Sequence, residues 1–82
     1  MAHFSGIALK DLRKEAGFTQ KLLASKIGIS RETVVAIENE HPKTLNSLNL
    51  EVVNAWWKNC RTLVSEASQI SFKLQVIKYF HL

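Results

Sequence analysis

The sequence predicts a small, mainly α-helical domain, and three observations lead to that fold class. The chain has 82 residues, which is enough for one small domain with a thin core. Hydrophobic residues make up 46% and charged residues 22%, a composition typical of globular proteins rather than disordered chains. Glycines and the one proline divide the first half into short segments with helical spacing of apolar residues. The dividing residues are Gly6, Gly17, Gly28 and Pro42.

The first helix is expected over residues 6–16. Ser5 is a suitable N-cap, because its hydroxyl can accept a hydrogen bond from a free N–H of the first turn. Gly17 stands where a left-handed residue commonly ends a helix. The apolar residues at helical spacing are Ile7, Ala8, Leu9, Leu12 and Ala16.

Two more short helices follow, joined by a tight connector. Thr19 caps the second helix, residues 20–27, and Ser30 caps a third helix only two residues after Gly28. Gly28 can take the positive φ of a sharp turn at no steric cost, and Ile29 can fill the corner between the helices. Because the connector is so short, the two helices should cross steeply, as in a helix-turn-helix.

The middle of the chain is expected to be a loop followed by helical sequence. The loop covers residues 41–44, and a fourth helix is expected to begin near Thr44 or Asn49. A break near Asn49 is the alternative, and it would give two helices in this stretch. The apolar residues of the helical stripe are Val53, Trp56, Trp57, Cys60, Leu63 and Val64.

The C-terminal stretch follows a different period. Apolar and polar residues alternate as far as Ile77, which is the period of a half-buried strand. The alternating apolar residues are Ile70, Phe72, Leu74 and Val76. A lone strand needs a partner for its edges, so we expect a short strand that pairs with a second copy; a short helix or an irregular tail is the alternative. The expected organisation is a helix-turn-helix domain over residues 1–66 and a dimerisation or partner-binding tail over residues 67–82.

The most specific motif lies between residues 12 and 39. Its elements stand in register and are Leu12-Arg13, Gly17, Thr19-Gln20, Leu23-Ala24, Ile27-Gly28-Ile29-Ser30, Val34 and Ile37-Glu38-Asn39. This pattern resembles the Cro/C1-type (XRE-family) helix-turn-helix of lambdoid phage repressors and many small bacterial regulators. The resemblance implies a lambda-repressor-like domain of four to five helices, whose third helix enters the major groove of double-stranded DNA.

The same resemblance implies which residues meet the DNA. Gln20 would contact the DNA backbone or an outer base, and Asn39 and Lys43 would touch phosphate. The recognition-helix positions that face the groove or its sugar-phosphate wall are Arg31, Glu32, Thr33, Val35 and Ala36. Arg13 and Glu38 match the position of a structural ion pair between the first and third helices.

The side-chain chemistry agrees with those roles. Arg31 can fork onto the O6 and N7 atoms of a guanine, and Glu32 can accept from a cytosine amino group. The methyl groups of Val35 can meet a thymine methyl. Helix N-termini present free N–H groups, which favours phosphate at Gln20 and Ser30. The formal net charge of +4 is spread over the chain, so it permits an anionic partner without requiring one.

The sequence departs from the family pattern in three places. Glu40 follows the third helix where family members usually have Gly, and Leu22 replaces the usual polar residue of the second helix. Leu22 is therefore expected to be an exposed apolar group. The region after Pro42 follows the family loosely and contains a Trp56-Trp57 pair. That pair is expected in the core or in a dimer interface, and a stacking platform for single-stranded bases is the alternative.

Other classes of function find little support in the residues. The one cysteine, Cys60, excludes an internal disulfide and a cysteine zinc site, and His3, His41 and His81 share no ligand spacing. No catalytic arrangement is visible and so small a chain has little material for pocket walls, so no enzyme activity, metal or cofactor is expected. Neither a bilayer-spanning run nor a signal peptide is visible, and a cytoplasmic, nucleoid-associated location is expected.

Together these features predict a sequence-specific, double-stranded-DNA-binding transcription regulator, either a repressor or an autoregulator. It would act as a homodimer on an inverted repeat, with recognition helices about one helical turn, roughly 34 Å, apart. The residues expected at the dimer interface are Trp56, Trp57, Cys60, Ile70, Phe72, Leu74 and Val76. The alternatives are an antitoxin with a cognate toxin partner, a controller protein of a restriction–modification system, and an interaction module with a degenerate helix-turn-helix.

Overall fold

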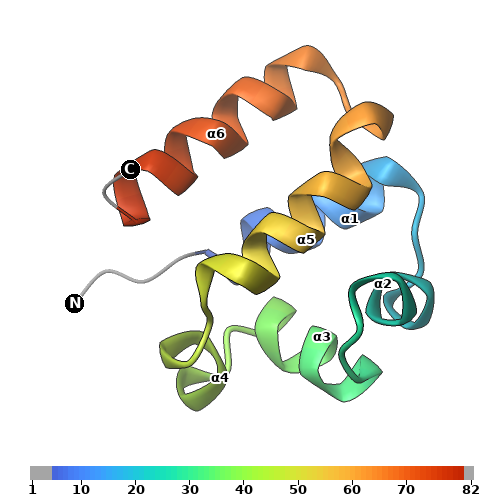
Figure 1. Ribbon diagram of the computed structural model, residues 1–82, viewed down its shortest axis with the longest axis vertical. Coiled ribbons are helices and arrows are strands. Elements are labelled where there is room, and N and C mark those ends of the chain that lie inside the picture. Colours follow the sequence, from blue (N-terminus) through green and yellow to red (C-terminus); the bar gives the residue numbers. More distant parts are fainter. Residues whose placement is uncertain (1–4, 81–82) are drawn as a thin grey trace.

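The computed structural model describes residues 5–80, and this part of the chain is built from helices without a strand. The predicted mainly α-helical fold is therefore confirmed. The elements in chain order are α1 (Gly6–Ala16), α2 (Gln20–Ile27), α3 (Arg31–Glu38), α4 (Pro42–Asn46), α5 (Leu50–Cys60), the 3-10 turn η1 (Arg61–Leu63) and α6 (Glu66–Phe80). Helix α5 crosses the middle of the molecule, with α2, α3 and α4 on one side and α6 on the other (Figure 1).

The first three helices begin and end where local sequence signals place them. The hydroxyls of Ser5 and Thr19 accept the backbone N–H groups of Ala8 and Leu22 at 3.1 and 3.0 Å. Gly17 closes α1 in the left-handed conformation, with φ of 85°. Side-chain caps replace the hydrogen bonds that the first turn of a helix cannot make internally, so these residues define the helix boundaries.

The middle of the chain contains two helices rather than one. Helix α4 starts at Pro42, inside the stretch expected to be a loop, because proline suits the first position of a helix where no N–H is required. Helix α5 begins one residue after Asn49, whose Oδ1 atom accepts the N–H of Val52 at 2.9 Å. The alternative with a break near Asn49 is thus the one that the structure shows. Leu63 lies beyond α5, in η1.

The prediction of a strand in the C-terminal stretch is wrong, because residues 66–80 form helix α6. The alternation arose because α6 carries apolar side chains on two opposite faces. Phe72 and Val76, four residues apart, turn toward the core, whereas Ile70 and Leu74 lie on the solvent side. Apart from its first and last turns, a helix makes its backbone hydrogen bonds within the segment itself, so this segment needs no strand partner.

The first turn of α6 is tied to α1 by one carboxylate. Glu15 accepts the Ser68 hydroxyl at 2.6 Å and the backbone N–H of Ser65 at 2.5 Å. These hydrogen bonds, the one from Ser68 first and then the one from Ser65, lower the pKa of the Glu15 carboxyl from its ordinary value. An anionic group at a helix N-terminus is also favoured by the helix dipole.

The hydrophobic core lies between α1, α2, α3 and α5 and also takes in one residue each of α4 and α6. Trp56 is fully buried, and its ring N–H donates to the backbone oxygen of Leu9 at 3.0 Å. Cys60 is equally buried, so both residues already have core positions within a single chain. Trp57 stacks on Phe72 with ring centroids 5.2 Å apart, which docks α6 on α5. The remaining buried apolar residues are Leu9, Leu12, Leu23, Ala24, Val34, Ile37, Leu45 and Val53.

Candidate nucleic-acid interface

The connector between α2 and α3 has the compact form that its sequence predicts. Gly28 is left-handed, with φ of 78°, and the N–H groups of Gly28 and Ile29 both donate to the Ala24 oxygen, at 2.9 and 3.1 Å. The Ile29 side chain packs against the core, so it fills the corner between the two helices. These contacts fix the position of α3 relative to α2.

Helix α3 has one face in the core and one at the surface. Val34, Ile37 and Glu38 are buried. Among the residues predicted to face DNA on α3 and at its C-cap, Arg31, Glu32 and Asn39 are exposed, and Thr33, Val35 and Ala36 are partly exposed. Residues four apart, such as Arg31 and Val35, lie one turn apart on the same face of the helix.

Ser30 serves α3 as its N-cap. Its Oγ atom accepts the backbone N–H of Thr33 at 3.1 Å and lies 2.8 Å from the Thr33 hydroxyl. The Ser30 hydroxyl is therefore engaged within the helix terminus. A phosphate at this position would be bound through backbone N–H groups of the first turn, which a helix leaves without internal partners.

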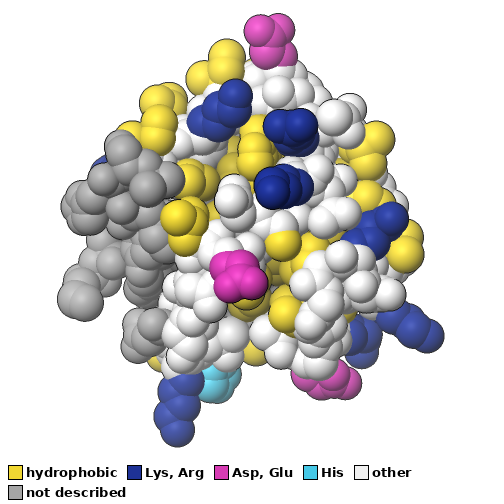
Figure 2. All heavy atoms as spheres, in the orientation of Figure 1, with side chains coloured by type: hydrophobic (Ala, Val, Ile, Leu, Met, Phe, Trp, Pro, Cys, Tyr) yellow, Lys and Arg dark blue, Asp and Glu magenta, His cyan; other side chains and the backbone are white. Residues whose placement is uncertain are grey.

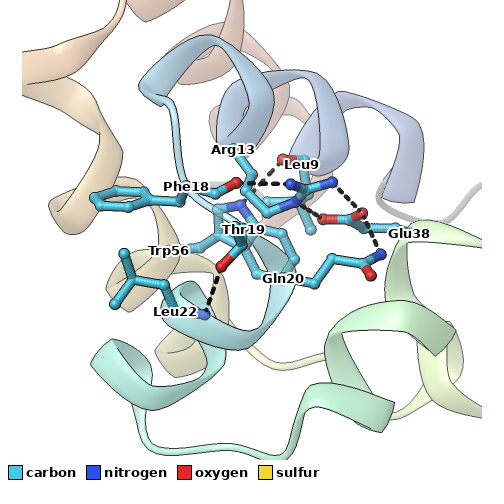
Figure 3. A network of polar contacts seen from close by, with 8 residues as sticks. All are labelled: Leu9, Arg13, Phe18, Thr19, Gln20, Leu22, Glu38 and Trp56. Carbon is cyan, nitrogen blue, oxygen red and sulfur yellow. Dashed lines mark hydrogen bonds and ion pairs between the residues drawn. The ribbon is translucent and has the colours of Figure 1, made fainter.

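A buried network joins the first three helices behind the exposed face of α3 (Figure 3). The Arg13 guanidinium from α1 donates twice to the Glu38 carboxylate of α3, from Nε at 2.6 Å and from Nη2 at 3.0 Å. Its Nη1 atom donates to the Phe18 oxygen at 2.7 Å. Arg13 and Glu38, the residues expected to pair, thus form a two-pronged ion pair whose side chains are 10% and 1% exposed.

Gln20, at the start of α2, belongs to the same network. Its side-chain amide donates to Oε1 of Glu38 at 3.1 Å. One of the two amide hydrogens is therefore directed inward, toward the ion pair. Within the described residues no buried side-chain nitrogen or oxygen lacks a hydrogen-bond partner. A network satisfied in this way holds α3 in one orientation, whereas an incomplete one would be destabilising.

The end of α3 explains one departure from the family pattern. Glu40 has φ of 56°, a left-handed conformation that normally favours glycine. The Glu40 and His41 N–H groups donate to the oxygens of Ile37 and Ala36 at 3.0 and 2.9 Å, which is the Schellman arrangement of a helix C-terminus. The Glu40 carboxylate then accepts the backbone N–H of Gly6 at 2.9 Å. Sequence reasoning identified the missing glycine but not this link to α1.

Exposed lysines lie on α2 and α4 as well. Lys21 and Lys26 are exposed on α2, and Lys43 is exposed on α4. The Lys26 ammonium lies 5.6 Å from the centre of the Phe18 ring, a cation–π distance. Leu22, which lies between these two lysines in the sequence, is 47% exposed. This agrees with the expectation that an apolar residue at a usually polar position of the second helix would lie at the surface.

Three further properties of the described residues concern metal binding, thiol reactivity and membrane insertion. Among residues 5–80, no three His, Cys, Asp or Glu side chains gather as a metal-ligand set; His3 and His81 lie outside the described residues. Burial raises the pKa of the Cys60 thiol to about 11, so the reactive thiolate is scarce at neutral pH. No helix of this part of the chain has the length and apolar character to cross a bilayer.

Comparison with known families identifies the helix-turn-helix. A family model described as helix-turn-helix matches residues 9–51, just over half of the chain. The match runs from α1 into the start of α5 and includes every residue predicted to contact DNA. Comparisons with curated proteins and with solved structures give no match.

Proposed function

Because the chain belongs to the Cro/C1-type helix-turn-helix family of DNA-binding transcription regulators, we propose that it binds one specific operator as a homodimer and represses transcription there, including that of its own gene. The observation that supports this proposal is the division of α3 into a core face and an exposed face. A helix with that division can lie in a major groove without unfolding any part of the domain.

Three side chains on the exposed face would read base edges. Arg31 is exposed at the N-terminus of α3, where a guanidinium can fork onto a guanine. Glu32 is also exposed and suits a cytosine amino group, while the half-buried Val35 suits a thymine methyl. Each such contact is worth about 1–3 kcal/mol of discrimination between base pairs.

Another set of residues would fix the position of the helix on the sugar-phosphate backbone. Gln20 has one amide hydrogen directed away from Glu38, and Asn39 and Lys43 are exposed beyond the end of α3. Phosphate contacts of this kind supply affinity and orientation but carry no sequence information. A dimer bound over a promoter would exclude polymerase, which is the simplest route from binding to repression.

Binding to the DNA upstream of the gene, measured by fluorescence anisotropy at two salt concentrations, tests this proposal. We expect specific, salt-sensitive binding in the wild type. Arg31→Ala should weaken binding to the specific site by about tenfold or more, and it should lower the ratio of specific to non-specific affinity. Arg61→Ala is the matched control, because Arg61 is an exposed arginine in η1, on the far side of the molecule from α3 (Figure 1). Equal binding by the wild type and Arg31→Ala would contradict the assignment of α3 as the reading helix.

A further inference from the structure

A cleft lies between α5 and α6, on the α6 side of α5, whereas α3 lies on the other side (Figure 1). Its volume is about 180 Å³, and its apolar lining includes Val53 and Trp57 from α5 and Phe72 and Val76 from α6. We call this space the α5–α6 cleft. Val53 and Phe72 are 1% and 3% exposed, and Trp57 stacks on Phe72, so the core holds the walls of the cleft in place.

The α5–α6 cleft has the size of a small organic ring. A closed apolar cavity of about 150 Å³ takes up benzene. The α5–α6 cleft is slightly larger and is open to solvent on one side, so it can hold one ring whose polar substituent stays in water. Aromatic rings pack favourably on one another, and the lining contains two, those of Trp57 and Phe72.

The rim of the cleft carries a positive charge that has no counter-charge. Lys73 and Asn54 belong to the lining, and both residues are exposed. Among the described side chains, neither the Lys73 ammonium nor the Asn54 amide has an ion-pair or hydrogen-bond partner. None of the described lining residues is acidic, because Glu51 and Glu66, the acids of α5 and α6, do not line the cleft. The rim therefore offers hydrogen-bond donors and positive charge beside an apolar lining.

The surroundings of the cleft carry charge of the same sign. Figure 2 shows hydrophobic side chains between α5 and α6, with Lys and Arg side chains beside them. The exposed cations of this part of the chain include Lys58, in the last turn of α5, and Arg61, in η1. A positive surface attracts anions from solution and disfavours cationic ligands. The cleft is thus expected to select an anion from among compounds of similar size.

We propose that the α5–α6 cleft binds a small aromatic monocarboxylate, with the ring among the apolar side chains and the carboxylate beside Lys73. The ammonium of Lys73 and the amide of Asn54 both donate hydrogen bonds, and the ring displaces water from apolar surface. A carboxylate without a ring would gain only an exposed ion pair, which contributes little. A neutral ring would gain the apolar contacts alone.

The α5–α6 cleft is separate from the DNA-binding surface. Helix α5 lies between α6 and α3, and the lining of the cleft includes none of the residues predicted to contact DNA (Figure 1). A ligand that contacts both α5 and α6 should also stabilise the folded chain, because it binds only when the two helices are packed together. The proposal goes beyond the proposed function, and it can be tested without DNA.

NMR titration of the chain with phenylacetate as the probe tests the ligand class. We expect a dissociation constant on the order of 1 mM at low ionic strength, because the cleft is small and open. Phenylacetamide has the same shape without the charge and should bind about threefold more weakly. Acetate, which lacks the ring, should not bind measurably. Equal binding of phenylacetate and phenylacetamide, or no binding of either, would overturn the proposal.

The two adjacent tryptophans report where the probe binds. Trp57 lines the cleft, whereas Trp56 is fully buried and its ring N–H donates to the backbone oxygen of Leu9. The indole N–H signal of Trp57 can be identified by its loss in Trp57→Phe. We expect that signal to shift during the titration while the Trp56 signal stays in place. A shift of the Trp56 signal as large as that of Trp57 would place the probe elsewhere and overturn the proposal.

Substitution of Lys73 tests the charged part of the site. Lys73→Met removes the charge and keeps the length of an exposed side chain, and circular dichroism checks that the fold is intact. This variant should bind phenylacetate about threefold more weakly than the wild type and should no longer distinguish phenylacetate from phenylacetamide. Lys14→Met, at an exposed lysine of α1, is the matched control and should bind like the wild type.

Unchanged discrimination between the two probes in Lys73→Met would overturn the assignment of Lys73 to the carboxylate. Since these titrations contain no DNA, their failure contradicts the α5–α6 cleft as a ligand site and leaves the proposed function unaffected. A chain that binds phenylacetate but not the upstream DNA contradicts the proposed function alone.

Discussion

The carboxylate of Glu40 accepts the backbone N–H of Gly6 at 2.9 Å, which joins the end of the recognition helix to the start of α1. The two segments approach so closely that a Cβ atom on Gly6 would stand 1.9 Å from the oxygen of Ile37. Because residue 6 is a glycine, the two segments can approach this closely, and the Glu40 carboxylate can reach the backbone N–H of Gly6. The hydrogen bond offsets the cost of a left-handed backbone at a non-glycine residue, about 1–2 kcal/mol.

Substitutions at Glu40 should separate the strain from the hydrogen bond. Glu40→Ala keeps the left-handed backbone and loses the acceptor, so we expect it to lower the free energy of unfolding by about 1–2 kcal/mol. Glu40→Gly also loses the acceptor but removes the strain, so it should be about 1 kcal/mol more stable than Glu40→Ala. Urea unfolding of the three proteins measures both differences. Equal stability of the two variants would show that the backbone at residue 40 carries no strain.

Removal of one partner from the buried ion pair should be among the most destabilising single changes in the domain. Glu38→Ala leaves the guanidinium of Arg13 buried without its counter-charge, which costs about 3–5 kcal/mol. Gln20→Ala removes one hydrogen bond from the edge of the network and should cost about 1 kcal/mol. Thermal unfolding monitored by circular dichroism ranks the variants, and a smaller loss for Glu38→Ala than for Gln20→Ala would contradict the central place of Glu38.

Stability should fall in acid partly through Glu15. Its pKa is lowered in the folded chain, so the unfolded chain binds the proton more readily around the ordinary pKa of 4.5. The stabilisation is thus fully present above that value and is lost as the pH falls through the lower, folded pKa. Urea unfolding across this acidic range should show a shallower pH dependence for Glu15→Gln than for the wild type. Glu51→Gln, on α5, is the control, and equal slopes for all three proteins would refute the role of Glu15.

Cys60 should react with thiol reagents only when the domain opens. Burial removes the thiol from solvent and raises its pKa to about 11, so both access and thiolate content are low in the folded state. Labelling by a chromogenic disulfide reagent at about pH 8 should be slow and should accelerate in urea along with unfolding. Rapid labelling of the folded protein would show that the α5 core is open to solvent.

The parts of the fold that were predictable are those specified by neighbouring residues. Ser5, Thr19 and Ser30 cap their helices through contacts only three residues away, so the start of each helix can be read from the sequence. The resemblance to a known family then supplied the ion pair, since the 25 residues that separate Arg13 from Glu38 leave no local signal.

The errors have a different physical origin. Helix α6 was mistaken for a strand because a helix that is apolar on two faces can produce an alternation of apolar and polar residues. The role of Glu40 was missed because its hydrogen-bond partner lies 34 residues away. The sequence cannot assign Trp56 to either the core or an interface, because an apolar stripe shows that a helix packs but not on what it packs.

The network of Arg13, Glu38 and Gln20 has an evolutionary consequence. These side chains set the orientation of α3 from its inner face, while Arg31 and Val35 on the outer face take no part in that support. The outer residues can therefore change without loss of the scaffold, and a duplicated gene can acquire a new target through a few substitutions. The same separation makes this small domain a suitable starting point for laboratory selection of altered binding preferences.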